Sequence, residues 1–182
     1  MIDRLSELVP ATSTACYAWA FLSNHAHFLF RSGNAGLPTL MRRLLTGYAV
    51  TFNRRHRRHG QLFQNRYKSI ICQEDLYLKE LVRYIHLNPL RAKLVSTMSD
   101  LNQYHYCGHS TLMGKIMCPW QDATYVLSFF GRNELDGREN YYSYVKEAMD
   151  KGRRPELVGG GLIRSLGGWA EAKNLRVKGQ DG

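Results

Sequence analysis

The segment 15–31 has the pattern of a β-hairpin, which commits this part of the chain to an antiparallel sheet. Residues 15–22 (ACYAWAFL) are apolar and aromatic, Ser23-Asn24 is a turn signal, and residues 25–31 (HAHFLFR) form the returning strand. Because alternate residues of a strand share a face, His25 and His27 are expected to project together. The other face is expected to carry the apolar residues Ala26, Phe28 and Phe30.

Helical periodicity appears twice after the hairpin. Pro38 suits a first helical turn, and apolar residues recur at helical spacing from there to about Arg55. A second apolar stripe predicts a helix over 75–88, ended by Asn88-Pro89 because the residue before a proline disfavours helical dihedrals. The weaker predictions are a strand in 61–73, loop-like chain over 96–119, helices over 122–130 and 138–150, and short helical pieces in the Gly-rich tail 153–182.

The charge distribution is the informative part of the composition. The net charge is +10 with a pI near 9.6, and no Asp or Glu occurs from Leu8 to Gln73. A surface that serves only solubility usually mixes both signs, so the pattern favours a polyanion such as nucleic acid as partner. A basic face that only aids solubility is the alternative.

Several classes of protein are disfavoured by the same composition. The sequence has no run of 18 apolar residues and no secretory signal, so we expect no membrane span. Its four cysteines form no CxxC pair, which favours a reduced, cytoplasmic protein.

Two imidazoles on one strand face are able to bind a divalent metal, although a third ligand is then needed. The alternative is a pair of core histidines that donate to backbone carbonyls. Tyr84 and Asn88 lie four residues apart in the second helix, so they share a helical face. Tyr84 offers a phenol nucleophile and Asn88 a carbonyl oxygen. Taken alone, a packed tyrosine is the favoured explanation for Tyr84, because the chain has 11 tyrosines, and a helix cap is the ordinary explanation for Asn88.

Three motifs in this order carry a resemblance to a known family: NHAHFLF (24–30), RRLLTGYAVTFNRRHRRHGQLFQNRYKSI (42–70) and LVRYIHLNPLRAKLV (81–95). They resemble the REP-associated tyrosine transposases, which are relatives of the single-strand transposases of the HUH (His-hydrophobic-His) endonuclease superfamily. The resemblance covers residues 16–95, and residues 153–169 are similar to an extension of longer members.

The resemblance implies an α+β fold of the ferredoxin-like HUH type, in which a small antiparallel sheet is backed by helices. Tyr84 would be the catalytic nucleophile, and the product would be a 5′-phosphotyrosine with a free 3′-hydroxyl. His25 and His27 would be metal ligands, with Asn88 as a candidate third, holding Mg²⁺ or Mn²⁺. The implied partner is single-stranded or hairpin DNA, without a nucleotide cofactor, and the protein would be a monomer or homodimer.

The basic residues between the motifs are predicted to contact the DNA backbone: Arg42, Arg43, Arg54, Arg55, Arg57, Arg58, Arg66 and Lys68. Tyr67 and Phe63 are interleaved with this charge and suit stacking on unpaired bases, with core packing as the alternative, favoured for Phe63. His56 and His59 are expected to contact phosphate. Cys107, His109 and Cys118 resemble a zinc half-site that lacks an evident fourth ligand.

The chain departs from the family pattern at its beginning, where the usual first strand is not evident. We therefore expect a sheet that lacks its first strand, with an exposed edge, in a product shortened at the N-terminus. The predicted organisation is a catalytic domain over 1–95, a helical extension over 96–152 and a tail over 153–182. The alternative function is an inactive DNA-binding remnant of such a transposase, which still recognises hairpin DNA through its basic helix. An RNA-binding protein would explain the charge and the aromatic residues but not the His pair and Tyr84.

Overall fold

A computed structural model describes residues 1–71 and 74–149. In chain order its elements are α1 (Ile2–Ala11), β1 (Ala15–Phe21), β2 (Ala26–Arg31), α2 (Leu37–Arg55), α3 (Glu74–His86), α4 (Asn88–Arg91), α5 (Met98–Gln103), α6 (His109–Leu112), α7 (Ala123–Ser128) and α8 (Glu134–Lys146). The described sheet has two antiparallel strands, β1 and β2. The fold is therefore α+β, as the sequence predicts.

The hairpin has the predicted strands and faces. Ala20 pairs with His27 and Cys16 with Phe30, and the register shifts between Cys16 and Ala18. Such a bulge adds one residue to β1, so that two successive side chains take the same face. Tyr17 and Ala18 accordingly belong to the same hydrophobic cluster.

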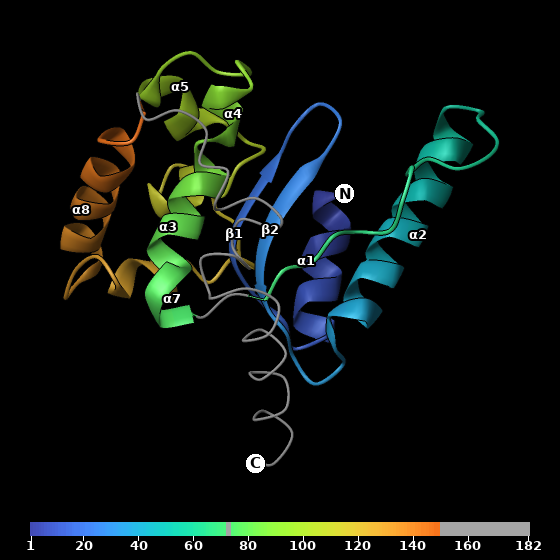
Figure 1. Ribbon diagram of the computed structural model, residues 1–182, viewed down its shortest axis with the longest axis horizontal. Helices are drawn as coiled ribbons and strands as arrows, with labels where there is room; N and C mark the ends of the chain where they lie inside the picture. The colour runs from blue at the N-terminus through green and yellow to red at the C-terminus, as the bar shows by residue number, and fades with distance from the viewer. Residues whose placement is uncertain (72–73, 150–182) are drawn as a thin grey trace, which may run out of the picture.

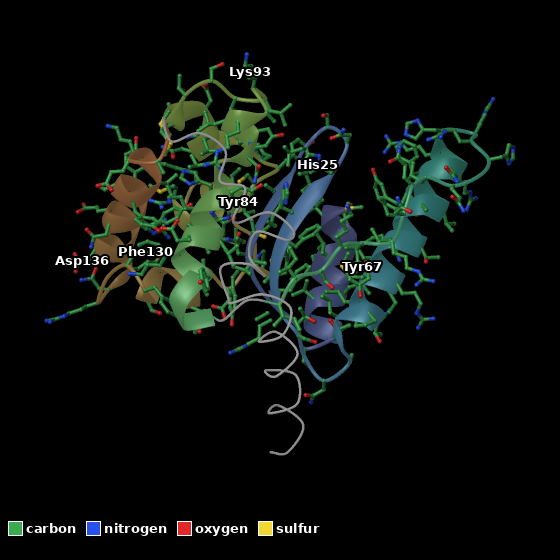
Figure 2. All side chains as sticks on the ribbon, in the orientation of Figure 1. His25, Tyr67, Tyr84, Lys93, Phe130 and Asp136 are labelled. Atoms are coloured by element: carbon green, nitrogen blue, oxygen red, sulfur yellow. The ribbon has the colours of Figure 1, made fainter. Side chains whose placement is uncertain are left out.

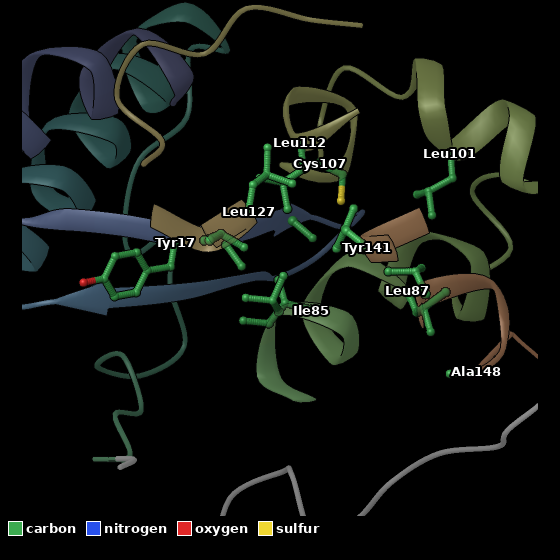
Figure 3. Close-up of a cluster of buried hydrophobic side chains, with 14 of the residues drawn as sticks. Tyr17, Ile85, Leu87, Leu101, Cys107, Leu112, Leu127, Tyr141 and Ala148 are labelled. Carbon is green, nitrogen blue, oxygen red and sulfur yellow. The ribbon is translucent and has the colours of Figure 1, made fainter. Parts of the chain in front are cut away.

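Helices cover both faces of the hairpin (Figure 1). On one face α1 and α2 pack against Trp19, Phe28 and Phe30. On the other face α3 and the later helices enclose a larger core, shown in Figure 3, whose labelled members include Tyr17, Ile85 and Tyr141. This core draws on residues from both sides of position 95, so the predicted helical extension shares its hydrophobic core with the predicted catalytic domain.

The two edges of the hairpin differ. Later segments bond to the outer edge of β1: Phe21 N donates to Tyr106 O at 2.8 Å, Gly108 N to Trp19 O at 2.9 Å and Asp122 N to Cys16 O at 2.8 Å. Within the described chain, no strand pairs with the other edge of β2. All of β2 is at least partly exposed, whereas the middle of β1 is buried.

Several boundaries correct the sequence predictions. Residues 61–71 form no strand, because this polar and basic stretch has few apolar side chains to bury; residues 72–73 lie outside the described part. The segment 96–119 is not purely loop, since it contains α5 and α6. A capping box at Thr97 and Asp100 starts α5.

Two further corrections concern helix ends. Pro89 does not stop the helical path, because it occupies the first turn of α4, where a missing N–H costs nothing. Helix α8 begins at Glu134, four residues before the prediction, because the Asn133 side chain accepts from Asp136 N. The predicted pieces in 153–182 lie outside the described residues.

Candidate active site

The two histidines lie side by side at the start of β2. Their ring centroids are 5.0 Å apart with the planes at 83°. His25 directly precedes the strand, where its carbonyl accepts from Leu22 N at 2.8 Å and closes the hairpin. The hairpin end therefore fixes the backbone from which both imidazoles project.

The tautomer of His25 follows from its neighbour. Its Nδ1 lies 2.7 Å from Asn24 Oδ1, and a carboxamide oxygen only accepts, so Nδ1–H is the donor. A neutral His25 ring therefore keeps the lone pair on Nε2. An oriented imidazole of this kind is what metal sites commonly use.

His27 is held in its neutral form. Burial lowers its pKa from 6.5 to about 4, and the neighbouring His25 adds repulsion against a second positive charge. At neutral pH the ring carries a lone pair rather than a charge, so it is able to ligate a cation.

Tyr84 faces this pair from α3. Its ring centroid lies 6.0 Å from that of His27, with the planes at 82°. Leu29 of β2 and Leu81 of α3 pack beside it. Figure 2 shows Tyr84 on the α3 side of the hairpin with His25 nearby. The structure thus brings together His25, His27 and Tyr84 within one chain.

Asn88 is buried at the start of α4 and bonds back to the helix that carries Tyr84. Its Nδ2 donates to Tyr84 O at 2.9 Å and to Ile85 O at 3.4 Å. The side chain therefore acts as the cap that the sequence left open as an alternative. With the amide nitrogen engaged in this way, the amide oxygen is the atom that a metal would use.

Arg91 is a site residue that the sequence analysis missed. Its guanidinium carbon lies 5.3 Å from the centroid of the Tyr84 ring. The spacing held a signal, because Arg91 follows Tyr84 by seven residues, which is two helical turns. Because the sequence analysis ended the helix at Asn88-Pro89, it did not place Arg91 on the same helical face as Tyr84.

The predicted DNA-binding basic residues are exposed, but they do not surround this site. Four lie on α2, two near its start and two at its C-terminal end, and the other four follow in residues 57–68. Helix α2 covers the α1 face of the hairpin, whereas Tyr84 lies on the opposite face. The basic surface and the His/Tyr site are therefore on different faces of the sheet.

The two aromatic residues in the basic stretch pack on the α2 side. Tyr67 is half-buried against the cluster of α1, α2 and β2 (Figure 2). The Phe63 ring lies 6.2 Å from that of Tyr48. Core packing thus accounts for part of each ring surface, and stacking on bases stays a prediction for Tyr67.

The suggested zinc half-site does not assemble. The Cys107 thiol donates to His86 O, while His109 bonds to Tyr141 and Asn102. In residues 1–71 and 74–149, no group of three or more His, Cys, Asp or Glu side chains is placed to hold a metal. Within these residues, a third ligand for a metal held by His25 and His27 would be another residue type, water or substrate.

Comparison with known proteins identifies one family. Residues 3–88 match the family described as "Transposase IS200 like". No curated protein and no solved structure matches the chain significantly. Among the described residues, no helix has the length and apolar character needed to cross a membrane.

Proposed function

Because residues 3–88 belong to the IS200-like transposases, we propose that this transposase nicks and rejoins single-stranded or hairpin DNA through a 5′-phosphotyrosine at Tyr84. The observation that carries the proposal is the approach of the Tyr84 ring to His27, at 6.0 Å between centroids, within one chain. A phenol beside two imidazoles combines a nucleophile with donors for a cation.

The proposed reaction is a phosphoryl transfer. The Tyr84 oxygen forms a bond to phosphorus and loses its proton to solvent, while the bond from phosphorus to the 3′-oxygen breaks and that oxygen takes up a proton. The energy of the phosphodiester is kept in the tyrosine ester. Attack by a 3′-hydroxyl on that ester reverses the step and rejoins DNA without a nucleotide cofactor.

The residues present fit a divalent cation such as Mn²⁺ or Mg²⁺. His25 offers Nε2, His27 is neutral at physiological pH, and Asn88 is the candidate for a third position. When bound, the cation supplies charge neutralisation at a non-bridging phosphate oxygen. The chain itself contributes the fixed orientation of His25 through Asn24 and the placement of Tyr84 by α3.

The basic surface suits the remainder of the DNA. Residues 56–71 lead back from the tip of α2 across α1 toward the start of α3 (Figure 1), and their Arg66 and Lys68 side chains are exposed. A strand bound along α2 and this connection would pass the free edge of β2 to reach Tyr84. Unpaired DNA bends around such an edge more readily than a duplex.

The deciding experiment is capture of the covalent intermediate. Labelled single-stranded hairpin DNA is incubated with the protein and Mn²⁺ and resolved on a denaturing gel. We expect an adduct with the wild type and with Tyr77→Phe, which removes a hydroxyl two turns earlier on α3, and none with Tyr84→Phe. An adduct that survives in Tyr84→Phe would refute the assignment of the nucleophile.

The competing hypothesis is an inactive DNA-binding remnant. It predicts that the wild type binds the same hairpin tightly but forms no adduct with Mn²⁺ or Mg²⁺. Binding measured in parallel by filter retention or anisotropy separates that case from a protein that does not recognise the DNA offered.

A further inference from the structure

Resting on the proposed function for the course of the DNA, we infer that Arg31 binds a backbone phosphate that flanks the linkage attacked by Tyr84. Arg31 is the last residue of β2 and follows His27 by four positions. Because alternate residues of a strand share a face, Arg31 lies on the same face of β2 as His27. At about 3.4 Å per residue the two Cα atoms are roughly 14 Å apart. The two side chains are therefore placed for different phosphates of one strand.

Side chains of β2 and α3 line the way from His27 to Arg31. His27 lies beside Tyr84, with 6.0 Å between the ring centroids. Leu29 is the next residue on that face of β2, and it packs together with Tyr84 against Leu81 of α3. Within the described chain, no strand covers the free edge of β2. DNA that leaves Tyr84 along this edge would therefore pass Arg31.

Two tyrosine rings position the Arg31 side chain. Tyr17 of β1 and Tyr125 of α7 stack on each other, with centroids 4.7 Å apart and planes at 22°. The guanidinium carbon of Arg31 lies 5.8 Å from the centroid of each ring. Such a cation–π contact directs the group without an acidic partner. The N–H donors of a guanidinium form a planar fork that matches two oxygens of a phosphate.

The surroundings of Arg31 suit an anion from outside the protein. Arg31 pairs with Ala15 in the sheet, so its backbone is fixed, while the residue is exposed. Arg83 of α3 is a contrast, because it is buried and Glu80 binds its Nη2 at 2.6 and 2.7 Å. Arg83 therefore serves packing between helices, whereas Arg31 presents an exposed positive charge on the site face of β2.

A phosphate-neutralisation scan tests the contact. The probe is a hairpin oligonucleotide with single-stranded flanks, in which each flanking linkage in turn carries a neutral methylphosphonate. Affinity is measured in the Tyr84→Phe background with EDTA, so that neither cleavage nor a metal contributes. We expect one linkage, different from the one that the wild type cleaves, whose neutralisation weakens binding about tenfold with Arg31 present and little with Arg31→Met. The same profile in both proteins would overturn the inference.

The salt dependence of binding provides an independent measurement. Loss of one phosphate contact to a single strand should lower the slope of log K against log salt by about 0.7. We expect this change for Arg31→Met and none for Arg132→Met, which removes an exposed charge from the loop between α7 and α8. An unchanged slope for Arg31→Met would contradict the contact. If melting shows that Arg31→Met is unstable, Arg31→Gln takes its place, and the same outcomes decide.

These outcomes are separable from those of the proposed function. A wild type that binds the hairpin without forming an adduct would refute nicking at Tyr84, whereas the scan in Tyr84→Phe would still decide whether Arg31 contacts a phosphate. A wild-type adduct with identical scans for both proteins would refute the role of Arg31 alone. An Arg31-dependent effect confined to the cleaved linkage would also overturn the inference, because the strand spacing separates Arg31 from the reacting phosphate.

Discussion

Removing the Tyr141 hydroxyl should destabilise the protein strongly, because two buried histidines share it. Tyr141 Oη lies 2.7 Å from Nδ1 of His86 and 2.7 Å from Nδ1 of His109. His109 Nε2 donates to Asn102 Oδ1 at 2.8 Å. A neutral His109 must then accept from the tyrosine through Nδ1, so the tyrosine oxygen accepts from His86. These contacts join α3 to α6 and α8.

The magnitude follows from the number of partners lost. Tyr141→Phe leaves both Nδ1 atoms without the hydroxyl, in rings that are fully buried. An unsatisfied buried polar group costs about 1–3 kcal/mol. We therefore expect a loss of about 2–4 kcal/mol in the free energy of unfolding. For a chain of this size that lowers the Tm by roughly 4–16 °C.

Urea unfolding followed by circular dichroism measures this loss, with Tyr142→Phe as the matched control. Tyr142 is the next residue of α8 and is half-exposed, so its variant should change stability by less than about 0.5 kcal/mol. Equal stability of the two variants would refute the reasoning that the hydroxyl is shared. The same outcome would show that the buried histidines find other partners.

Three further predictions concern pH, salt and metal. Burial lowers the pKa of His109 from 6.5 to about 3, so on acidification the unfolded chain binds the proton before the folded protein does. Between pH 6.5 and 3 this group should therefore lower the free energy of unfolding by about 1.4 kcal/mol per pH unit. In urea melts at several pH values, the free energy of unfolding of His109→Gln should fall less steeply with decreasing pH. DNA affinity should drop steeply with salt, and Arg54→Gln/Arg55→Gln should reduce the slope of log K against log salt by about 1.4 if each contacts one phosphate of a single strand; an unchanged slope places the DNA elsewhere. Mn²⁺ should raise the Tm of the wild type by ligand linkage, and His25→Ala/His27→Ala should abolish that rise; a rise that persists would place the metal at another site.

Local patterns predicted the local structure well. The turn at Ser23-Asn24 and the alternation in 25–31 gave the hairpin and its faces, and the apolar spacing after Pro38 gave α2, from Leu37 to Arg55. These features depend on neighbours a few residues apart, which the sequence displays directly. Residues 61–71 were wrongly predicted as a strand because a short apolar end resembles one even where no partner strand lies alongside.

Long-range contacts left no such pattern. His86 and Tyr141 are 55 positions apart, and nothing near either residue indicates that the imidazole and the hydroxyl form a hydrogen bond. The same holds for the segments near Tyr106 and Asp122 that bond to the edge of β1. In the site, the pairing of His27 with Tyr84 was expected through a family resemblance, whereas Arg91 required the observed course of α4.

The basic surface and Tyr84 lie on different faces of the hairpin, which gives a physical explanation for the absence of Asp and Glu from residues 8–73. Residues 8–73 include α2, the connection after it and β2. These elements make one side of the hairpin and its free edge. Under the proposed function, DNA that begins on α2 and ends at Tyr84 would follow this route, since the outer edge of β1 is bonded to residues 106–108 and 121–122. A carboxylate anywhere along that route would repel successive phosphates. The absence of acids over the whole span, rather than the two histidines alone, therefore supports a path that turns around β2.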